Sequence, residues 1–524
     1  MTVTPGESTN PIATAVAPGY VFDGAALELG GLMADAETLT DVHIKIPISM
    51  LNRHGLVAGA TGTGKTKTLQ LIAEQLSSNG VPVFAADMKG DLSGLATPGT
   101  PSDKLTARTA SVGQEWAAKS FPVEYFALGE NGAGVPIRVS VDTFGSTLLS
   151  RVLELNDTQE SSLGLVFHYA KNAGLKLVDL SDLRSVLTYL TSSEGKADLT
   201  GLGGLSSATV GVILRELIAF SDQGADAFFG QPEFDSNEFL VVEADGRGRI
   251  SLLELPNVAD KPAVFSTFLM WLLADLYRKL PEVGDPDKPK LVFFFDEAHL
   301  LFKGASKDFL DTITQTVRLI RSKGVGVFFI SQSPTDIHQD VLAQLGSRVQ
   351  HQLRANTPND AKALKQTVNT YPTSVYPDLG QVIQTLGIGE AIVTVMNERG
   401  APTPVAWTRL RAPESLMGAT DAAAIDAAVK ASPLFARYGT AVDPADSAAD
   451  TLGAKTAASQ AAAKAEAEVK AAAKEQRSAP KTSHPGHPAE PHSAADEAMA
   501  MATKIAKNKQ VQREAVKLLK NLFK

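Results

Sequence analysis

The stretch GATGTGKT at residues 59–66 determines how the remainder of this sequence is interpreted. It fits the pattern G-x-x-x-x-G-K-[ST] at every position, with apolar residues before it that predict a strand and a helical pattern after it. Glycines in such a loop let backbone N–H groups converge on phosphate oxygens, and the following helix N-terminus adds its positive dipole. The stretch therefore predicts a loop that binds the phosphates of a nucleoside triphosphate.

Two positions of this loop have specific expected roles. Lys65 should reach the β- and γ-phosphates, and Thr66 should hold Mg²⁺. The sequence thus predicts ATP and Mg²⁺ as cofactors. The residues expected to bind the nucleotide are Gly59, Ala60, Thr61, Gly62, Thr63, Gly64, Lys65, Thr66 and Lys67.

A second signal is LVFFFDEAHLLF at 291–302, whose dense apolar run predicts a buried strand. Asp296 and Glu297 follow that run at the carboxyl end of the strand, where open α/β sheets bind their ligands. We expect Asp296 to hold Mg²⁺ through water and Glu297 to orient and polarise the attacking water. Phosphoryl transfer requires mainly positioning and charge neutralisation, so this pair predicts hydrolysis of the bound triphosphate.

Other polar residues lie at predicted strand ends. Gln332 follows the apolar run in GVGVFFISQS at 324–333, and we expect it to act as a catalytic residue that senses the γ-phosphate. Asp87, in the segment DMKGD, either contacts the Mg²⁺ shell or caps a turn. These strand ends extend the predicted site beyond the Gly-rich loop.

Two further groups of residues have structural interpretations. His54 and His299 are expected to be packing or hydrogen-bonding residues, although His299 completes the letters DEAH. The basic cluster of Arg318, Arg321 and Lys323 is expected to form the solvated face of a helix.

Composition limits the class of protein. The chain has 524 residues, of which 44% are hydrophobic and 20% charged, with a net charge of −9 and no cysteine. Disulfides and thiolate metal sites are therefore excluded. The acidic balance argues against a surface that binds DNA everywhere, but it leaves room for a local basic patch. The N-terminus lacks the pattern of a signal peptide and no apolar run could span a bilayer, so a cytoplasmic location is expected.

Apolar strands alternating with helices predict an α/β fold with a buried parallel sheet. Strands are expected near 42–48, 56–58, 81–87, 122–128, 238–244, 250–255, 290–297, 324–332, 347–353 and 389–396. The expected divisions are a short N-terminal β segment (1–45), the first part of the core (46–140), a helical insertion (141–235), the second part of the core (236–415), a C-terminal extension (416–439), a flexible linker (440–492) and a basic amphipathic helix (493–524).

Five segments of the chain carry a family resemblance: RHGLVAGATGTGKT, AADMKGD, LVFFFDEAHLLF, RLIRSKGVGVFFISQSP and LGSRVQHQLRANTP. Together they resemble the HerA/FtsK class of P-loop ATPases, and within it the bacterial HerA-like, YjgR-type proteins. The resemblance covers roughly residues 42–415. It implies a RecA-like core in which an extra strand lies between the P-loop strand and the Asp-Glu strand. It also implies a homo-oligomer, usually a hexameric ring, with active sites between subunits.

A site between subunits needs a cation donated by the neighbouring subunit. By position, Arg348 best matches the family's arginine finger, and Arg354 is the second candidate; only the resemblance supports this choice. The chain departs from HerA in its N-terminal region, because about 45 residues are too few for the β-barrel with which HerA docks a nuclease. That partnership is therefore not expected here.

Two functions remain open. In the first, a ring-forming ATPase moves DNA through its pore. In the second, an ATPase switch or scaffold acts on an unidentified protein partner at the membrane surface, where the basic C-terminal helix could lie on anionic lipid. Docking of that helix on the ring is the alternative to lipid binding. A metabolic kinase is disfavoured, because Glu297 suits a water molecule better than an acceptor group.

Overall fold

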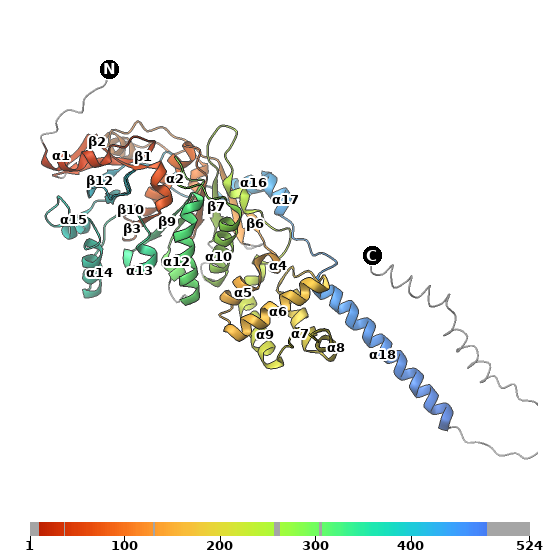
Figure 1. The fold of residues 1–524 in the computed structure, drawn as a ribbon. Coiled ribbons are helices and arrows are strands. Elements are labelled where there is room, and N and C mark those ends of the chain that lie inside the picture. The colour runs from red at the N-terminus through yellow and green to blue at the C-terminus, as the bar shows by residue number, and fades with distance from the viewer. Residues whose placement is uncertain (1–9, 36, 129–131, 256–261, 303–306, 479–524) are drawn as a thin grey trace, which may run out of the picture. The chain divides into compact units, whose positions relative to one another are not determined.

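The computed structural model describes residues 10–35, 37–128, 132–255, 262–302 and 307–478. Its centre is a twelve-stranded sheet in the order β2-β1-β12-β11-β10-β3-β9-β8-β4-β7-β5-β6 (Figure 1). The strands are β1 (Ala26–Ala34), β2 (Glu37–Pro47), β3 (Gly55–Ala58), β4 (Val83–Asp87), β5 (Val123–Leu128), β6 (Val135–Ile137), β7 (Ile250–Glu254), β8 (Leu291–Phe295), β9 (Val325–Ser331), β10 (Ser347–Gln350), β11 (Glu390–Thr394) and β12 (Ala406–Leu410).

The strands from β10 to β6 in this order all run parallel, whereas β11, β12, β1 and β2 pair antiparallel. Strand β9 lies between β3, which leads into the Gly-rich loop, and β8, which leads into Asp296. The extra strand implied by the family resemblance is therefore present. Because parallel strands end at one edge, the loops after β3, β4, β8 and β9 meet there.

The two faces of the sheet are covered by different helices. On β8, Phe293 belongs to the apolar cluster that contains α10 (Pro262–Lys279) and α12 (Lys307–Ile320). Its neighbour Phe294 belongs to the opposite cluster, which contains α2 (Lys65–Ser78). Side chains of a strand alternate between faces, so a continuous apolar run is required when both faces are covered. Figure 1 shows α10 and α12 side by side on their face.

The remaining helices are shorter or lie outside this sandwich. They are α1 (Pro11–Val16), α3 (Asp103–Ala110), α4 (Val141–Phe144), α5 (Ser146–Val152), α6 (Asp157–Ala173), α7 (Leu180–Thr191), α8 (Ser193–Asp198), α9 (Ser207–Asp222), α11 (His299–Phe302), α13 (Gln339–Leu342), α14 (Pro358–Val368), α15 (Leu379–Thr385), α16 (Ala422–Ala431), α17 (Pro433–Tyr438) and α18 (Ala448–Ser478). Short 3₁₀ turns are η1 (Ala17–Tyr20), η2 (Ile48–Arg53), η3 (Ser93–Ala96), η4 (Ala225–Phe228), η5 (Ser236–Leu240), η6 (Arg321–Lys323) and η7 (Pro334–Asp336).

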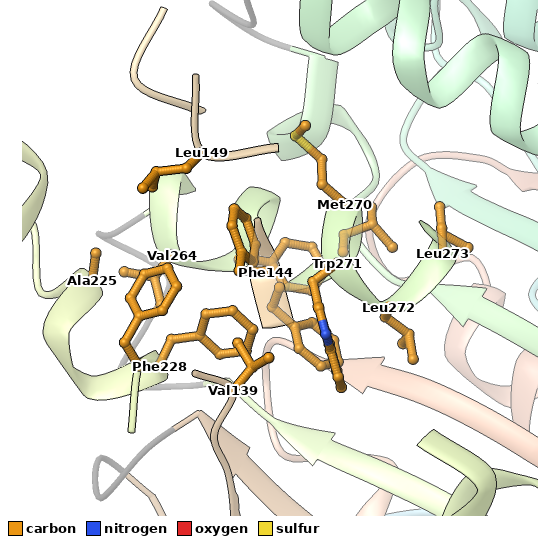
Figure 2. Packing of buried hydrophobic residues seen from close by; sticks show 14 of the residues in the cluster. Val139, Phe144, Leu149, Ala225, Phe228, Val264, Met270, Trp271, Leu272 and Leu273 are labelled. Atoms are coloured by element: carbon orange, nitrogen blue, oxygen red, sulfur yellow. The ribbon is translucent and has the colours of Figure 1, made fainter. Parts of the chain in front are cut away.

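The predicted helical insertion is formed by α4 to α9. Its apolar side chains share one cluster with α10 (Figure 2). Phe228 is fully buried and lies edge-on to Phe268 and Trp271 of α10, with ring centroids 6.1 and 5.9 Å apart. Phe144 approaches Phe228 from α4 at 6.3 Å. The insertion is therefore packed onto the core through aromatic contacts.

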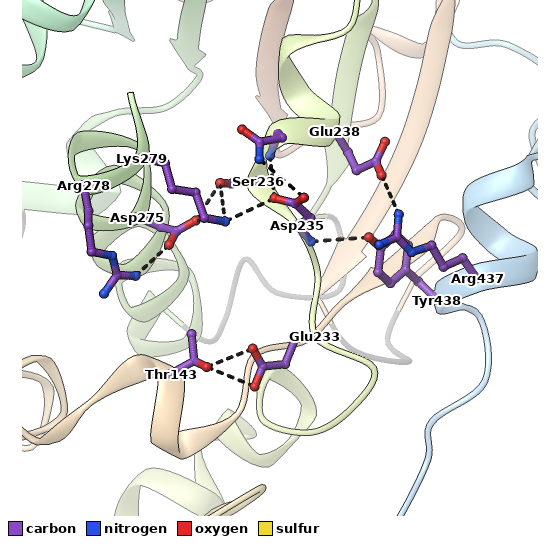
Figure 3. Close-up of polar contacts among 11 residues, drawn as sticks. Thr143, Glu233, Asp235, Ser236, Glu238, Asp275, Arg278, Lys279, Arg437 and Tyr438 are labelled. Atoms are coloured by element: carbon purple, nitrogen blue, oxygen red, sulfur yellow. Dashed lines mark hydrogen bonds and ion pairs between the residues drawn. The ribbon is translucent and has the colours of Figure 1, made fainter. Parts of the chain in front are cut away.

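A polar network joins the chain that leaves the insertion to α10 (Figure 3). The side chain of Asp275 is only 3% exposed, and it pairs with Lys279 at 2.7 Å and with Arg278 at 2.7 Å. The Ser236 hydroxyl donates to the same carboxylate at 2.6 Å. A buried charge with this number of partners is compensated, so the network holds η5 against α10.

One sequence-based expectation about elements is wrong. Residues 238–244 do not form a strand: the Asp235 side chain accepts from Asn237 N–H and starts η5 instead, while β7 already pairs with β4 and β5 on either side. The strand expected near 42–48 is confirmed as part of β2, which forms a hairpin with β1, a strand that the sequence analysis did not expect. The glycines in β1 obscured its alternation.

The region from 440 to 492 was expected to be a flexible linker, partly helical at best. Residues 448–478 form α18, because alanine, lysine and glutamate all favour helix. The basic amphipathic helix predicted at 493–524 lies outside the described residues. Contacts group the described chain up to Lys455 into one compact unit. Among the described helices, none is both long and apolar enough to cross a membrane.

Candidate active site

The loop between β3 and α2 has a conformation that its glycines make accessible. Gly59, Gly62 and Gly64 have φ of 155°, 82° and 114°. A Cβ on Gly59 would lie 2.5 Å from the Cβ of buried His351, so only glycine fits there. Gly64 is the N-cap of α2 and offers no side chain to its first turn. The first N–H groups of α2 are therefore left for an anionic ligand.

Hydrogen bonds fix this loop to the strands beside β3. Gly59 N–H donates to Ser331 O at 3.2 Å, at the end of β9. Ala60 N–H donates to Gln352 O at 2.8 Å, just beyond β10. The Thr63 carbonyl accepts from Gly389 N–H at 3.1 Å, just before β11. The loop is thus held from several strands, and its shape does not depend on its own residues alone.

Lys65 begins α2 and is largely buried. Its Nζ donates to the loop carbonyls of Gly59 at 2.7 Å and Ala60 at 3.2 Å. Burial lowers the pKa of Lys65, while the charges of Glu297 and Asp296 act in the opposite direction. The predicted P-loop lysine and the predicted acidic pair therefore lie close enough to interact electrostatically.

Asp296 and Glu297 lie directly after β8, as predicted. Glu297 N–H donates to Asp296 Oδ1 at 2.9 Å, while Asp296 Oδ2 is buried without a hydrogen-bond partner in the described chain. Burial raises the pKa of Asp296 to about 6. Glu297 has φ of 46°, in the left-handed region that non-glycine residues seldom adopt. Strain at such a position is typical of functional sites.

The Glu297 carboxylate contacts two residues to which the sequence analysis gave no catalytic role. Lys89 Nζ donates to Oε1, and His299 Nδ1 lies 3.3 Å from Oε2. Burial alone would raise the pKa of Glu297, but the hydrogen bond and the charge of Lys89 outweigh it and lower the pKa. The motif DMKGD contained Lys89, but only the adjacency of β4 and β8 shows that it meets Glu297.

Asp87 forms a turn, as one of its two interpretations predicts. Its Oδ1 accepts from the N–H groups of Lys89 at 3.1 Å and Gly90 at 2.8 Å, and its Oδ2 accepts from Leu92 N–H at 2.8 Å. Glu254, opposite Asp87 on β7, was missed by the sequence analysis. Burial, together with the charges of Asp87 and Asp91, raises the pKa of Glu254 to about 8.

Gln332 is exposed at the same edge of the sheet. It borders a hollow of about 860 Å³ together with Thr61 of the loop, His299 and Arg354. All four follow β3, β8, β9 or β10, so the predicted sensor and the second finger candidate lie beside the P-loop. His299 is therefore not only a packing residue.

Arg348 lies toward the amino ends of the parallel strands, opposite to the ends that carry the P-loop. In β10 it pairs with Leu56 of β3, before the strand reaches the loop. Its Nη1 donates to Thr370 O at 3.2 Å, and it borders a second hollow of about 590 Å³. This hollow is also bordered by Arg53, Arg318 and Arg321. The structure thus separates Arg348 from the nucleotide loop of its own chain.

The basic cluster near the end of α12 is only partly solvated. Arg318 is exposed, but the Lys323 side chain is 12% exposed and lies 4.9 Å from the Tyr277 ring centroid. The expectation that all three basic residues form a solvated face is therefore wrong for Lys323. Its ammonium group lies over the Tyr277 ring of α10, which a pattern of charges alone does not reveal.

The family profile described as "Helicase HerA-like C-terminal" matches residues 33–523. The chain belongs to this HerA-like family. The "Probable helicase MJECL08" of Methanocaldococcus jannaschii is 23% identical over 425 residues, covering 76% of this chain and 73% of that protein. The "DNA double-strand break repair helicase HerA" of Sulfolobus acidocaldarius is 22% identical over 385 residues, covering 71% and 67%.

Solved structures agree with the fold of the HerA-like chain. The plasmid coupling protein TrwB in complex with an ATP analogue superposes with a TM-score of 0.50 and 18% identity, covering 76% of this chain and 98% of that one. The HerA-like chain is therefore a P-loop ATPase with a RecA-like core. The sequence-based assignments of family, fold class and enzyme class are confirmed.

Proposed function

We propose that this HerA-like ATPase hydrolyses Mg²⁺-bound ATP at residues 59–66 and the acidic pair, and that hydrolysis drives the movement of DNA. The observation that carries the proposal is the arrangement of Asp296 and Glu297 at the end of β8, where their charges act on Lys65 of the P-loop. A lysine for the phosphates and two carboxylates for metal and water make up the minimum that phosphoryl transfer to water requires.

The residues beside the P-loop fit a magnesium ion. Asp296 Oδ2 is a buried oxygen without a hydrogen-bond partner among the described residues, and Thr66 is in the first turn of α2. Mg²⁺ prefers such oxygen ligands. Asp296 and Thr66 would hold the ion, which neutralises phosphate charge when bound.

Each remaining site residue has one task in this proposal. The backbone N–H groups of Gly62, Gly64 and Lys65 hold phosphate oxygens, and the Lys65 ammonium group balances their charge. The Glu297 carboxylate orients a water molecule and accepts its proton, while Gln332 contacts the γ-phosphate from the end of β9. General-base assistance of this kind contributes about 10²–10⁴-fold in rate.

The proposed assembly is a homo-oligomeric ring, expected to be a hexamer, in which a neighbouring subunit supplies a cation. Arg348 remains the first candidate and Arg354 the second. The gathering of Arg348 with Arg53, Arg318 and Arg321 around one hollow supports a role for that surface beside an anion of another subunit. An arginine in this role contributes about 10³–10⁵-fold in rate in other NTPases.

DNA is the preferred substrate because both relatives named above are described as helicases. The description of the Sulfolobus acidocaldarius protein also names the repair of DNA double-strand breaks. The alternative is an ATPase switch that acts on a protein partner, which the acidic composition with net charge −9 favours. The cytoplasmic location expected from the sequence stays a prediction.

Turnover of ATP by the purified protein, measured without DNA and with single- or double-stranded DNA at low and moderate salt, tests the proposal. We expect DNA to stimulate turnover, and we expect the stimulation to weaken as salt rises, because phosphate contacts release counterions. The variant Lys65→Ala should show no turnover in any condition, which controls for contaminating ATPases.

Two results would decide against parts of this proposal. ATP turnover that no DNA changes, while the protein binds DNA no better than bovine albumin does, favours the protein-directed switch. Full turnover by Lys65→Ala contradicts the active site itself.

A further inference from the structure

Lys89 occupies a defined position next to Glu297. It follows β4 by two residues, Glu297 follows β8 by two, and the two strands are neighbours in the sheet. The Lys89 side chain is 49% exposed and that of Glu297 is 11% exposed. The lysine thus reaches from the surface to a mostly buried carboxylate.

The backbone of Lys89 is fixed before its side chain makes this contact. Asp87 accepts the N–H groups of Lys89, Gly90 and Leu92, which folds residues 87–92 into a tight turn. Gly90 has φ of 75°, a conformation that favours glycine at this position. The turn therefore directs Lys89 toward β8 and restricts its backbone to few of the conformations that a loop residue could adopt.

The Glu297 side chain has few other constraints. Its Oε2 forms no hydrogen bond with the described residues, and His299 Nδ1 approaches that oxygen at 3.3 Å without forming one. The backbone of Glu297, with φ of 46°, sets where the side chain starts but not where its carboxylate ends. Lys89 Nζ is consequently the group that fixes Oε1.

We propose that Lys89 is a positioning residue for hydrolysis, whose ammonium group orients the Glu297 carboxylate so that its second oxygen faces the attacking water. This inference rests on the proposed role of Glu297 as the residue that activates that water. A displacement of about 1 Å in a catalytic group can lower a rate by about 10²-fold, so one hydrogen bond to the carboxylate is sufficient to matter.

The alternative role for Lys89 is direct binding of a nucleotide phosphate. The two roles predict different kinetics. A residue that acts through Glu297 changes kcat and has no effect once Glu297 is neutralised. A residue that binds phosphate changes the affinity for ATP whether Glu297 is present or not.

The test compares the full-length wild type with Lys89→Met, Lys89→Arg, Glu297→Gln and the double variant, using steady-state ATP turnover and binding of a fluorescent ATP analogue. Lys119→Met is a matched control, because Lys119 forms a similar ion pair, with Glu414 at 2.8 Å, in which the lysine is 57% and the carboxylate 18% exposed. Circular dichroism and thermal melting establish that each variant folds.

We expect Lys89→Met to lower kcat by about 10-fold or more while KM changes by less than about 2-fold, and we expect Lys89→Arg to recover part of the loss. In the Glu297→Gln background, Lys89→Met should cause no further loss, and Lys119→Met should behave as wild type.

A further loss of kcat in the Glu297→Gln background would overturn the inference, as would unchanged kcat in Lys89→Met. Weaker analogue binding by Lys89→Met with Glu297→Gln assigns the lysine to phosphate binding instead. If Glu297→Gln itself retains wild-type turnover, the proposed function of the acidic pair fails first, and this result separates the two failures.

Discussion

Glu297 is the residue on which the proposed chemistry of this site most depends. Replacement by glutamine keeps the size of the side chain but removes the carboxylate that would accept a proton. We expect Glu297→Gln to bind ATP normally and to hydrolyse it at least ~100-fold more slowly, the scale of losing a positioned base. Single-turnover hydrolysis and equilibrium nucleotide binding measure the two steps separately. Turnover within a few-fold of wild type would place water activation elsewhere.

His54 makes the stability of the fold depend on pH. Its Nε2 is 2.7 Å from Val317 O and its Nδ1 accepts from Val327 N–H at 3.0 Å, so the buried ring is neutral. Burial, and then the charge of Arg321, lower the pKa of His54 to about 4. The unfolded chain, with the ordinary pKa of about 6.5, binds the proton first as pH falls.

Stability from His54 is therefore complete above about pH 6.5 and is lost as pH falls toward 4, by up to roughly 3 kcal/mol. We expect His54→Gln to flatten this pH dependence, measured as the free energy of unfolding in denaturant between pH 7 and 4. His168→Gln, at an exposed position of α6, is the control. An unchanged slope in His54→Gln would show that His54 is protonated in the folded state.

At the scale of elements, α10 connects the ATPase core with the helical insertion. Phe228 of η4 packs against Phe268 and Trp271 of α10. We expect Phe228→Ala to lower the free energy of unfolding by about 3–5 kcal/mol, as for other large-to-small core changes. Denaturant unfolding measures this value, with Leu202→Ala as control because Leu202 is 39% exposed. A loss below about 1 kcal/mol would mean that the insertion is not packed on α10 through this ring.

Elements also show where sequence patterns succeed and fail. The strands β8 and β9 were predictable because both faces are covered, which requires uninterrupted apolar residues. The segment from 238 to 244 is also apolar, yet its first residues belong to η5 (Ser236–Leu240) and Val242 forms only an isolated bridge with Gly248. Both sides of β7 are already paired, with β4 and with β5. Local composition cannot show which strands pair with one another in the folded sheet.

At the scale of the whole molecule, Arg348 tests the proposed ring. It lies toward the amino ends of the parallel strands, whereas the P-loop of its own chain follows their carboxyl ends. Any role in hydrolysis therefore requires a neighbouring subunit. We expect Arg348→Ala to lose turnover, and mixing it with Lys65→Ala to restore part of it, because a mixed ring contains some sites with both residues.

Native mass spectrometry of the mixture establishes that mixed oligomers form. The same experiment with Arg354→Ala tests the second candidate. If confirmed mixed oligomers show no recovery with Arg348→Ala, that residue does not act between subunits.

The sequence alone was sufficient to predict the phosphate-binding loop at residues 59–66 and the acidic pair at 296–297. Each is a contiguous pattern whose chemistry depends on local backbone geometry: glycines permit the loop, and an apolar strand delivers the acidic pair. The confirmed P-loop ATPase assignment follows from these local patterns together with the family resemblance.

The contact between Lys89 and Glu297, the separation of Arg348 from the P-loop and the raised pKa of Glu254 were decided only by the tertiary structure. Each depends on which strands are neighbours, and on which edge of the sheet a residue lies. The order of the strands is set by packing among segments far apart in the chain, so no local sequence pattern predicts it. The sequence therefore predicted the phosphate-binding loop, whereas it did not predict that Lys89 lies beside Glu297.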